Sequence, residues 1–367
     1  MKAPAYILSR SLVNACDKIP VISKRASMVT ALLQATSCFN KLNIISSVEA
    51  SVDDIRAFHS EDYVQYIISA DDSNEEEDDS YGLGFDCPLK CDTWSLVKEI
   101  AGASLLAAET LIKGESDVVI NWYGGWHHGQ RDSASGFCYV NDVVLCIQKL
   151  CQKYEKILYI DMDVHHGDGV ENAFLFSSKV MTVSFHQFEP GFFPGSGKLT
   201  DVGMGKGKLY SVNVPYKSGI NDSQFCFLFK NIINEVMKIF VPSAIVCQCG
   251  ADTLSKDPLG EANVSLEGYM NCVKLVLGLR KPLVLLGGGG YNNANAAKLW
   301  TAITLSILGE SIPEEIPEHN FFPLYGPDFT FNVSRSLRKT ENTPEYLNDI
   351  INFIKGNLKN IKKSVDG

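Results

Sequence analysis

Short apolar runs recur along this chain, and they restrict its fold more than any other feature of the sequence. Each run contains four to six residues, and most are rich in valine and isoleucine. Runs of this length and composition are too short for helices and are typical of strands buried on both faces of a parallel sheet. The six runs span residues 118–122, 157–160, 180–185, 210–214, 245–249 and 283–286.

Longer stretches with the apolar spacing of amphipathic helices separate these runs. Strands that alternate with helices favour a sheet covered by helices on both faces, so we expect an α/β fold with a central, mainly parallel sheet. Ser27 precedes an apolar helical pattern and is expected to cap it. A last helix is expected near residues 345–358, after a proline-rich loop at 311–329. The other helical stretches span residues 93–113, 141–153, 223–240, 266–279 and 293–308.

The chain shows no linker and no internal repeat, so we expect its 367 residues to form a single domain, residues 1–367. A hydrophobic content of 45% with 21% charged residues is typical of a globular protein with a large core. No apolar segment reaches the roughly 18 residues of a membrane span, and the N-terminus does not have the pattern of a signal peptide. The 11 cysteines form no CxxC pair, which favours reduced thiols inside the cell.

One acidic segment, residues 71–80, is expected to form a loop within this domain. Residues 71–79 hold seven carboxylates and no cation, and without them the net charge of −10 would be −3. Repulsion among these carboxylates favours a solvated loop. Alternatively, their negative potential attracts a basic partner such as a lysine-rich peptide. Because this charge repels phosphates, direct binding to nucleic acid is not expected.

Histidine, aspartate and tyrosine residues follow the ends of five predicted strands. Ligands of open parallel sheets bind beyond the carboxyl ends of the strands, where these side chains would gather. Five of the 7 histidines lie between residues 127 and 186, a concentration that packing alone does not explain. The residues at this predicted polar edge are His127, His128, Asp161, Asp163, His165, His166, Asp168, His186, Asp252 and Tyr291.

Asp163 and His165 are two residues apart on an extended chain, so their side chains point the same way. Together with Asp252 they offer two oxygens and a nitrogen to a divalent cation, which would neutralise the two carboxylates. Three protein ligands leave a position open for water, as in catalytic zinc sites, although Fe(II), Co(II) and Mn(II) also suit this set. The same periodicity puts Asp161 on this face, so spacing does not decide whether it is a ligand or supports one.

Asp161 and Asp168 are then free to accept hydrogen bonds from His127 and His128, because a catalytic histidine needs an acceptor on its second ring nitrogen. An activated water, an imidazole that takes its proton and the neutral hydroxyl of Tyr291 would make a hydrolytic site for a carbonyl compound. Such a site needs no serine or cysteine nucleophile.

Seven motifs between residues 124 and 292 give the chain a resemblance to the zinc-dependent histone deacetylases of class I, and the match runs from about residue 6 to the C-terminus. The resemblance implies an arginase/deacetylase-like fold, with a sheet of about eight strands flanked by helices, in one deacetylase catalytic domain. It also implies hydrolysis of Nε-acetyl-lysine in histone tails or other proteins, with release of acetate, and a role in chromatin and transcription regulation. The motifs are GGWHH, SGFCYVND, YIDMDVHHGDGV, TVSFH, GFFPGSG, GADTLSKDPLG and LLGGGGYN.

The resemblance implies roles for individual catalytic residues. His128, paired with Asp168, would be the general base and then the general acid. His127, paired with Asp161, would mainly stabilise the transition state electrostatically. Tyr291 would polarise the acetyl carbonyl and hold the oxyanion.

The resemblance also implies metal sites. Asp163, His165 and Asp252 would bind one catalytic Zn²⁺, with Fe²⁺ or Co²⁺ as possible substitutes. Two monovalent sites, expected to hold K⁺, would use backbone carbonyls for the most part. The first consists of Asp161, Asp163, His165, Ser184 and Phe185, and the second of Phe174, Ser177, Val180 and Tyr210.

For the substrate, the resemblance implies a narrow tunnel walled by Phe137 and Phe193. The Gly136 carbonyl would accept a hydrogen bond from the substrate amide, and Asp86 would hold the peptide backbone at the rim. One departure from the family pattern follows GGWHH, where the family usually has alanine and a basic pair and this chain has Gly129, Gln130 and Arg131. We therefore expect a looser loop behind the two histidines.

Three other functions deserve comparison. A binuclear manganese ureohydrolase would need a second aspartate close behind Asp252, but the next carboxylate is Asp257. A reader or scaffold would tolerate the loss of site residues, whereas none of the expected residues is missing here. A deacylase for longer acyl chains or acetylpolyamines is the nearest alternative. The expected partners are acetylated peptides or proteins, without a membrane or a large corepressor complex, in the nucleus and cytoplasm.

Overall fold

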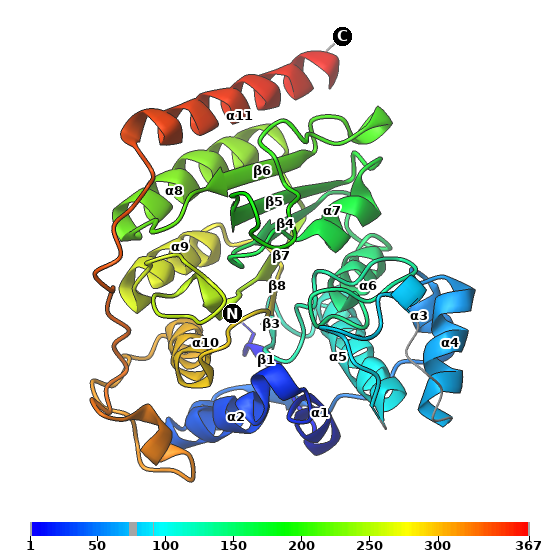
Figure 1. Ribbon diagram of the computed structural model, residues 1–367, viewed down its shortest axis with the longest axis vertical. Helices are drawn as coiled ribbons and strands as arrows, with labels where there is room; N and C mark the ends of the chain where they lie inside the picture. Colours follow the sequence, from blue (N-terminus) through cyan, green and yellow to red (C-terminus); the bar gives the residue numbers. More distant parts are fainter. Residues whose placement is uncertain (1, 73–78, 91, 366–367) are drawn as a thin grey trace.

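The computed structural model describes residues 2–72, 79–90 and 92–365 (Figure 1). Within that part of the chain the strands form one sheet of eight strands, in the order β2-β1-β3-β8-β7-β4-β5-β6. Every neighbouring pair runs parallel, so the expected α/β fold with a parallel sheet is confirmed. The strands are β1 (Ala5–Ile7), β2 (Asn43–Ile45), β3 (Val118–Asn121), β4 (Ile157–Asp161), β5 (Val180–Gln187), β6 (Ser211–Tyr216), β7 (Ala244–Gln248) and β8 (Leu283–Leu286).

Strands β3 to β8 lie at the six predicted apolar runs, with ends that differ by at most two residues. The sequence did not reveal β1 and β2, because each has three residues, too few to show a pattern. Strand β2 also lies at the edge of the sheet and is largely exposed. The five strands followed by the predicted polar residues, β3, β8, β7, β4 and β5, are consecutive neighbours. Their carboxyl ends therefore meet at one edge.

Helices cover both faces of the sheet, as Figure 1 shows. One side of the sheet carries a row of helices in which each contacts the next, in the spatial order α2, α10, α9, α8 and α11. The other side carries α5, α6 and α7. Helix α1 contacts both α2 and α5. The helices are α1 (Arg10–Cys16), α2 (Arg25–Ala35), α3 (Val52–Arg56), α4 (Glu61–Asp72), α5 (Thr93–Lys113), α6 (Asp142–Leu150), α7 (Asp168–Phe174), α8 (Asp222–Ile239), α9 (Leu266–Gly278), α10 (Asn293–Leu308) and α11 (Pro344–Val365).

Polar side chains define where several helices begin. Asn221 and Ser265 cap α8 and α9 by accepting hydrogen bonds from backbone N–H groups of the first turn. The expectation that Ser27 caps a helix is wrong, because α2 begins at Arg25 and Ser27 lies inside its first turn. The Ser27 hydroxyl donates instead to Asp17, at 2.5 Å. The Ser27 N–H also donates to Asp17, so this residue at the end of α1 bonds the start of α2 in place of a local serine cap.

The last predicted helix lies within the described residues, and the acidic segment 71–80 is described only at its two ends. The last helix is longer than expected and extends to Val365. Most of the acidic segment 71–80, namely residues 73–78, lies outside the described residues. Of the remainder, residues 71 and 72 end α4, and a short 3₁₀ helix begins at Asp79.

The buried apolar side chains of both helical layers and the sheet form one contiguous cluster. Near its centre the indoles of Trp122 and Trp300 stack with their centroids 5.8 Å apart. Trp300 donates from Nε1 to the Cys249 carbonyl at the end of β7, which ties α10 to the edge where the polar residues gather. None of the helices described is both long enough and apolar enough to span a membrane.

The sheet centre should dominate stability. Leu285, in β8, is 0% exposed and Leu337 is 100% exposed, so the same substitution probes two extremes. We expect Leu285→Ala to lower the free energy of unfolding by about 2–5 kcal/mol and Leu337→Ala by less than about 0.5 kcal/mol. Urea denaturation followed by circular dichroism measures both. Equal effects of the two substitutions would contradict this placement of the core.

Candidate active site

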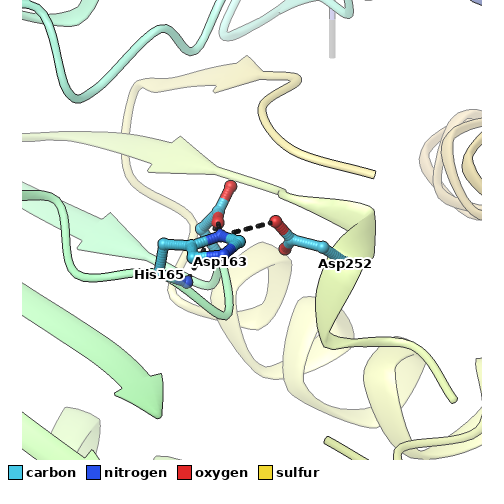
Figure 2. A group of neighbouring side chains, drawn as sticks. All are labelled: Asp163, His165 and Asp252. Atoms are coloured by element: carbon cyan, nitrogen blue, oxygen red, sulfur yellow. Dashed lines mark hydrogen bonds and ion pairs between the residues drawn. The ribbon is translucent and has the colours of Figure 1, made fainter. Parts of the chain in front are cut away.

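Asp163, His165 and Asp252 converge at the carboxyl edge of the sheet, as predicted (Figure 2). Asp163 and His165 follow β4, and Asp252 lies in a short 3₁₀ helix after the neighbouring strand β7. Nδ1 of His165 lies 3.2 Å from Oδ1 of Asp163 and 3.1 Å from Oδ2 of Asp252. All three side chains are buried. The adjacency of two parallel strands therefore brings together residues almost 90 positions apart in the sequence.

The donor set of these three residues fits a divalent cation. Their candidate ligand atoms all lie within 4.8 Å of one another. Oδ2 of Asp163 accepts hydrogen bonds from the Gln248 amide at 2.7 Å and from the Gly289 N–H at 2.8 Å. The backbone N–H of Val164 fixes Oδ1 of Asp252 at 3.0 Å. Oδ1 of Asp163, which also accepts from the His165 N–H at 3.1 Å, and Oδ2 of Asp252 are the oxygens that face the imidazole.

The site retains protons when no cation neutralises it. Burial disfavours a charged imidazole, but the hydrogen bonds and charges of Asp163 and Asp252 outweigh burial and raise the pKa of His165 to about 10. Burial and the charge of Asp163 raise the pKa of Asp252 to about 8. Protons on these two residues therefore stand in for the positive charge that a cation would supply.

The two remaining aspartates pair with the two remaining histidines, as predicted. Nδ1 of His127 lies 2.7 Å from Oδ2 of Asp161, and Nδ1 of His128 lies 2.7 Å from Oδ1 of Asp168. Asp161 also accepts a hydrogen bond from the Tyr159 hydroxyl at 2.7 Å. Asp161 thus supports His127 and does not join the group of candidate ligands, which spacing alone could not decide.

The paired histidines have opposite charge states near pH 7. Burial opposes protonation of His127, but the charges of Asp161 and Asp163 outweigh burial and raise its pKa to about 9. Burial and the neighbouring charge of His127 lower the pKa of His128 to about 4, although Asp168 acts in the opposite direction. One imidazole can therefore stabilise negative charge while the other is free to accept a proton.

Aromatic rings enclose these groups. Phe193 packs edge-on against His128 with centroids 4.9 Å apart, and Phe137 packs edge-on against Tyr291 at 5.7 Å. Phe192 turns inward and stacks on His165 at 5.3 Å, whereas Phe193 remains 41% exposed. The two neighbouring phenylalanines therefore differ, because one packs on a candidate ligand and the other is partly exposed.

Two glycine segments let the backbone approach the site closely. Gly136 has φ +53, and a Cβ there would lie 2.5 Å from the His128 ring. A Cβ on Gly289 would lie 2.0 Å from Asp252. Beyond the second segment, burial raises the pKa of Tyr291 well above its ordinary value, which keeps its hydroxyl protonated and able to donate. Asp86 accepts a hydrogen bond from the Gly136 N–H at 2.8 Å and so lies against the wall of the site.

The loop behind the histidines, for which the sequence predicted a looser arrangement, is closely packed and hydrogen-bonded in this structure. A Cβ on Gly129 would lie 2.9 Å from the Asn141 backbone nitrogen. Nε2 of Gln130 donates to the His128 carbonyl at 2.9 Å and to Oδ2 of Asp168 at 3.0 Å. Asn172 donates in turn to Oε1 of Gln130 at 3.0 Å. Gln130 therefore ties together both members of one histidine–aspartate pair.

Sequence reasoning missed several residues that support the site. Arg25 is buried, donates to the Gly290 carbonyl at 2.9 Å and lies over the Trp300 ring. Asp257 accepts hydrogen bonds from the backbone N–H groups of Tyr291 and Asn292, at 2.8 and 3.3 Å. Neither residue follows a strand or belongs to a ligand-spacing pattern. Only the tertiary structure reveals them.

The residues predicted for the monovalent sites lie at the β4–β5–β6 side of the sheet. Asp161 and Ser184 are partners in the β4–β5 register. In the second set, the Ser177 N–H donates to the Phe174 carbonyl at 2.8 Å, and the Tyr210 carbonyl accepts from Thr182. Each set is therefore local in space. Binding of K⁺ there stays a prediction.

Comparison with known proteins places the chain in the histone deacetylase family. Residues 19–307 match the histone deacetylase domain. The chain is 45% identical over 363 residues to histone deacetylase 8 of Danio rerio, covering 98% of this chain and 96% of that protein. It is 44% identical over 362 residues to histone deacetylase 8 of Xenopus tropicalis, covering 98% of each. Human histone deacetylase 1 is 40% identical over 344 residues, 93% of this chain and 71% of that protein. The chain is a member of class I of this family.

Cation binding should displace protons. At pH 7 the raised pKa values of His165, about 10, and Asp252, about 8, leave both residues protonated, and both must lose the proton to bind a cation. The affinity should therefore rise with pH. We expect release of at least one proton when Zn²⁺ is added to metal-free protein, measured by calorimetry in buffers of different ionisation enthalpy. Asp86→Asn should retain this signal and His165→Ala should lose it. A binding heat that does not depend on the buffer would contradict the assignment.

Proposed function

We propose that this chain hydrolyses the amide of Nε-acetyl-lysine in proteins, giving lysine and acetate. The observation that carries the proposal is the three-residue cation site of Asp163, His165 and Asp252. It lies beside two histidine–aspartate pairs and Tyr291, and Asp163, His127, His128 and Tyr291 line one pocket with Trp126 and Phe137. These are the groups that hydrolysis of an unactivated amide requires.

Each catalytic side chain has a role that follows from its charge. The bound cation, which we propose is zinc, would supply Lewis-acid polarisation of the carbonyl and activation of water. His128, neutral near pH 7, accepts the proton of the attacking water and returns it to the leaving amine. His127, charged near pH 7, stabilises the negative charge that develops. Tyr291 donates its hydroxyl proton in a hydrogen bond to the oxyanion.

We propose the following substrate contacts. Phe137 and Phe193 would flank the apolar lysine stem, and the Gly136 carbonyl would accept from the substrate amide. Asp86, already fixed by the Gly136 N–H, would hold the peptide backbone at the rim. Two K⁺ ions at the monovalent sites would stabilise the strand ends from which the catalytic residues extend.

We place this activity in one catalytic domain, residues 1–367, with the acidic segment 71–80 as an internal loop. The histone deacetylase names of the relatives support acetylated histone tails and other acetylated proteins as substrates, and a role in chromatin and transcription regulation. Their names also support a nuclear location, and we propose a cytoplasmic fraction as well. Neither direct nucleic-acid binding nor a large corepressor complex is part of the proposal.

A two-metal ureohydrolase mechanism is disfavoured by the position of Asp257. This next carboxylate after Asp252 is occupied by three backbone N–H groups, those of Leu259, Tyr291 and Asn292. It is therefore not available to bridge a second metal ion. One cation per chain is the proposed stoichiometry.

Zinc titration tests the proposal. Metal-free protein should regain acetate release from an acetyl-lysine peptide, and activity should saturate near one zinc per chain. Tyr291→Phe should lower kcat by about 10²–10³-fold with little change in KM, because the hydroxyl acts mainly on the transition state. Saturation near two zinc ions would favour the binuclear alternative. No release from folded, zinc-loaded protein, with acetyl or longer acyl chains, would refute the hydrolase.

Gln130 provides a prediction specific to this chain. Removing the Gln130 amide leaves Oδ2 of Asp168 without this hydrogen bond. Asp168 then orients His128, the proposed base, less firmly. We expect Gln130→Ala to lower kcat about tenfold at unchanged KM, by analogy with residues that orient catalytic ligands. Gln152→Ala, at an exposed position, is the matched control. Equal kcat values for the two variants would show that Gln130 does not position the pair.

A further inference from the structure

A second pocket contains a buried carboxylate that the proposed reaction does not use. This pocket lies between α1 and the first half of α5. Its walls combine apolar groups, including Ile19, Pro20 and Leu96, with charged side chains. Glu99, on α5, lines it and is only 4% exposed. We call it the Glu99 pocket.

Glu99 lacks the partner that the other carboxylates of the pocket have. Asp92 forms an ion pair with Lys18 at 2.6 Å, and Glu49 forms one with Lys98 at 2.6 Å. Oε2 of Glu99, by contrast, is buried and has no hydrogen-bond partner among the described residues. A buried carboxylate without a partner destabilises the fold, which makes this group a candidate for binding a cation from outside the chain.

The composition of the pocket specifies the kind of cation. Three lining carboxylates face two lining lysines, so the lining carries a net negative charge. The apolar wall suits an aliphatic stem, and the buried carboxylate suits an ammonium or guanidinium group at its end. A lysine or arginine side chain has both parts. A hydrated metal ion would leave the apolar wall without a contact.

The walls of the Glu99 pocket and of the active-site pocket are formed by adjoining residues of the same two segments. Lys18, Ile19 and Pro20 line the first, and the next residues of the same segment, Val21 and Ile22, line the second. Tyr139 lines the first and residues 136–138 line the second. Tyr139 also donates to the Pro88 carbonyl at 2.6 Å, two residues after the rim residue Asp86. The proposed rim residue Asp86 and the two pockets are therefore connected through Pro88 and Tyr139.

We propose that the Glu99 pocket binds the side chain of an unacetylated lysine or arginine that lies a few residues from the acetyl-lysine in the same substrate. This inference rests on the proposed function and adds a substrate class to it, namely proteins with a second basic residue near the acetylated one. Glu99 then acts as a specificity residue, because it touches substrate away from the reacting atoms.

Matched peptides test this proposal. A single arginine is moved along an acetyl-lysine peptide and compared, at each position, with citrulline, which has the same shape without the charge. We expect the zinc-loaded full chain to show about tenfold higher kcat/KM with arginine at one or two positions, because a hydrogen bond to a charged group is typically worth that much. Glu99→Gln should abolish this preference and leave kcat/KM for the citrulline peptides unchanged.

Glu109→Gln is the control on the same helix, because Glu109 pairs with Lys113 and Lys149 and does not line the pocket. It should keep the arginine preference. Glu99→Gln should not lower the melting temperature, since it removes an unpaired buried charge. If that variant fails to fold, the comparison in the unmodified chain still decides: no position with an arginine preference overturns the proposal.

Fluorescence anisotropy with labelled arginine and citrulline peptides separates this proposal from the proposed function, because binding does not require turnover. Tighter binding of arginine peptides that depends on Glu99, without acetate release, would support the pocket and refute the hydrolase. An arginine preference that survives Glu99→Gln would overturn the pocket. Glu99-dependent binding of n-butylammonium without any arginine preference would also overturn it, in favour of a free small amine.

Discussion

The burial of three carboxylates side by side is the constraint on which the rest of this structure depends. Asp161, Asp163 and Asp252 lie at the carboxyl ends of two adjacent strands and have almost no contact with solvent. Such charges are tolerated only with partners. His127 neutralises one of them, and a bound divalent cation, with the neutral His165 as its third ligand, would neutralise the other two. Glycines at the strand ends are required because any larger residue would collide with these carboxylates.

The electrostatic field of these buried carboxylates also explains why His127 and His128 differ in charge. Both are buried, and each has an aspartate on Nδ1. His127 lies near two carboxylates, Asp161 and Asp163, and so becomes the charged member. That charge, together with burial, keeps His128 neutral. The difference arises from position relative to the carboxylates and not from residue type.

The sequence predicted much of this site because short-range rules control it. Alternation along an extended chain placed Asp163 and His165 on one side, and strand-end geometry added Asp252 and Tyr291. The pairing of two aspartates with two histidines followed from their number. These rules fail where a contact between two elements decides. The Ser27 hydroxyl bonds Asp17, at the end of α1, instead of capping a helix.

Residues such as Asp257, Gln130 and Glu99 carry no local signal, because their importance depends on what packs around them. Strands β1 and β2 were missed for a related reason, since three residues are too few for a pattern and their pairing alone defines them. The fold class and the reacting groups are thus readable from sequence. The groups that orient them, and the pocket beside them, are properties of the tertiary structure.

X-ray absorption at the zinc edge of the zinc-loaded full chain tests most directly whether a cation neutralises the buried carboxylates. The site of Asp163, His165 and Asp252 predicts a first shell of oxygen and nitrogen alone, at about 2.0–2.2 Å, with outer-shell scattering from a single imidazole. Zinc–sulfur scattering at about 2.3 Å, or the signature of two or more imidazoles, would place the metal elsewhere and contradict the account.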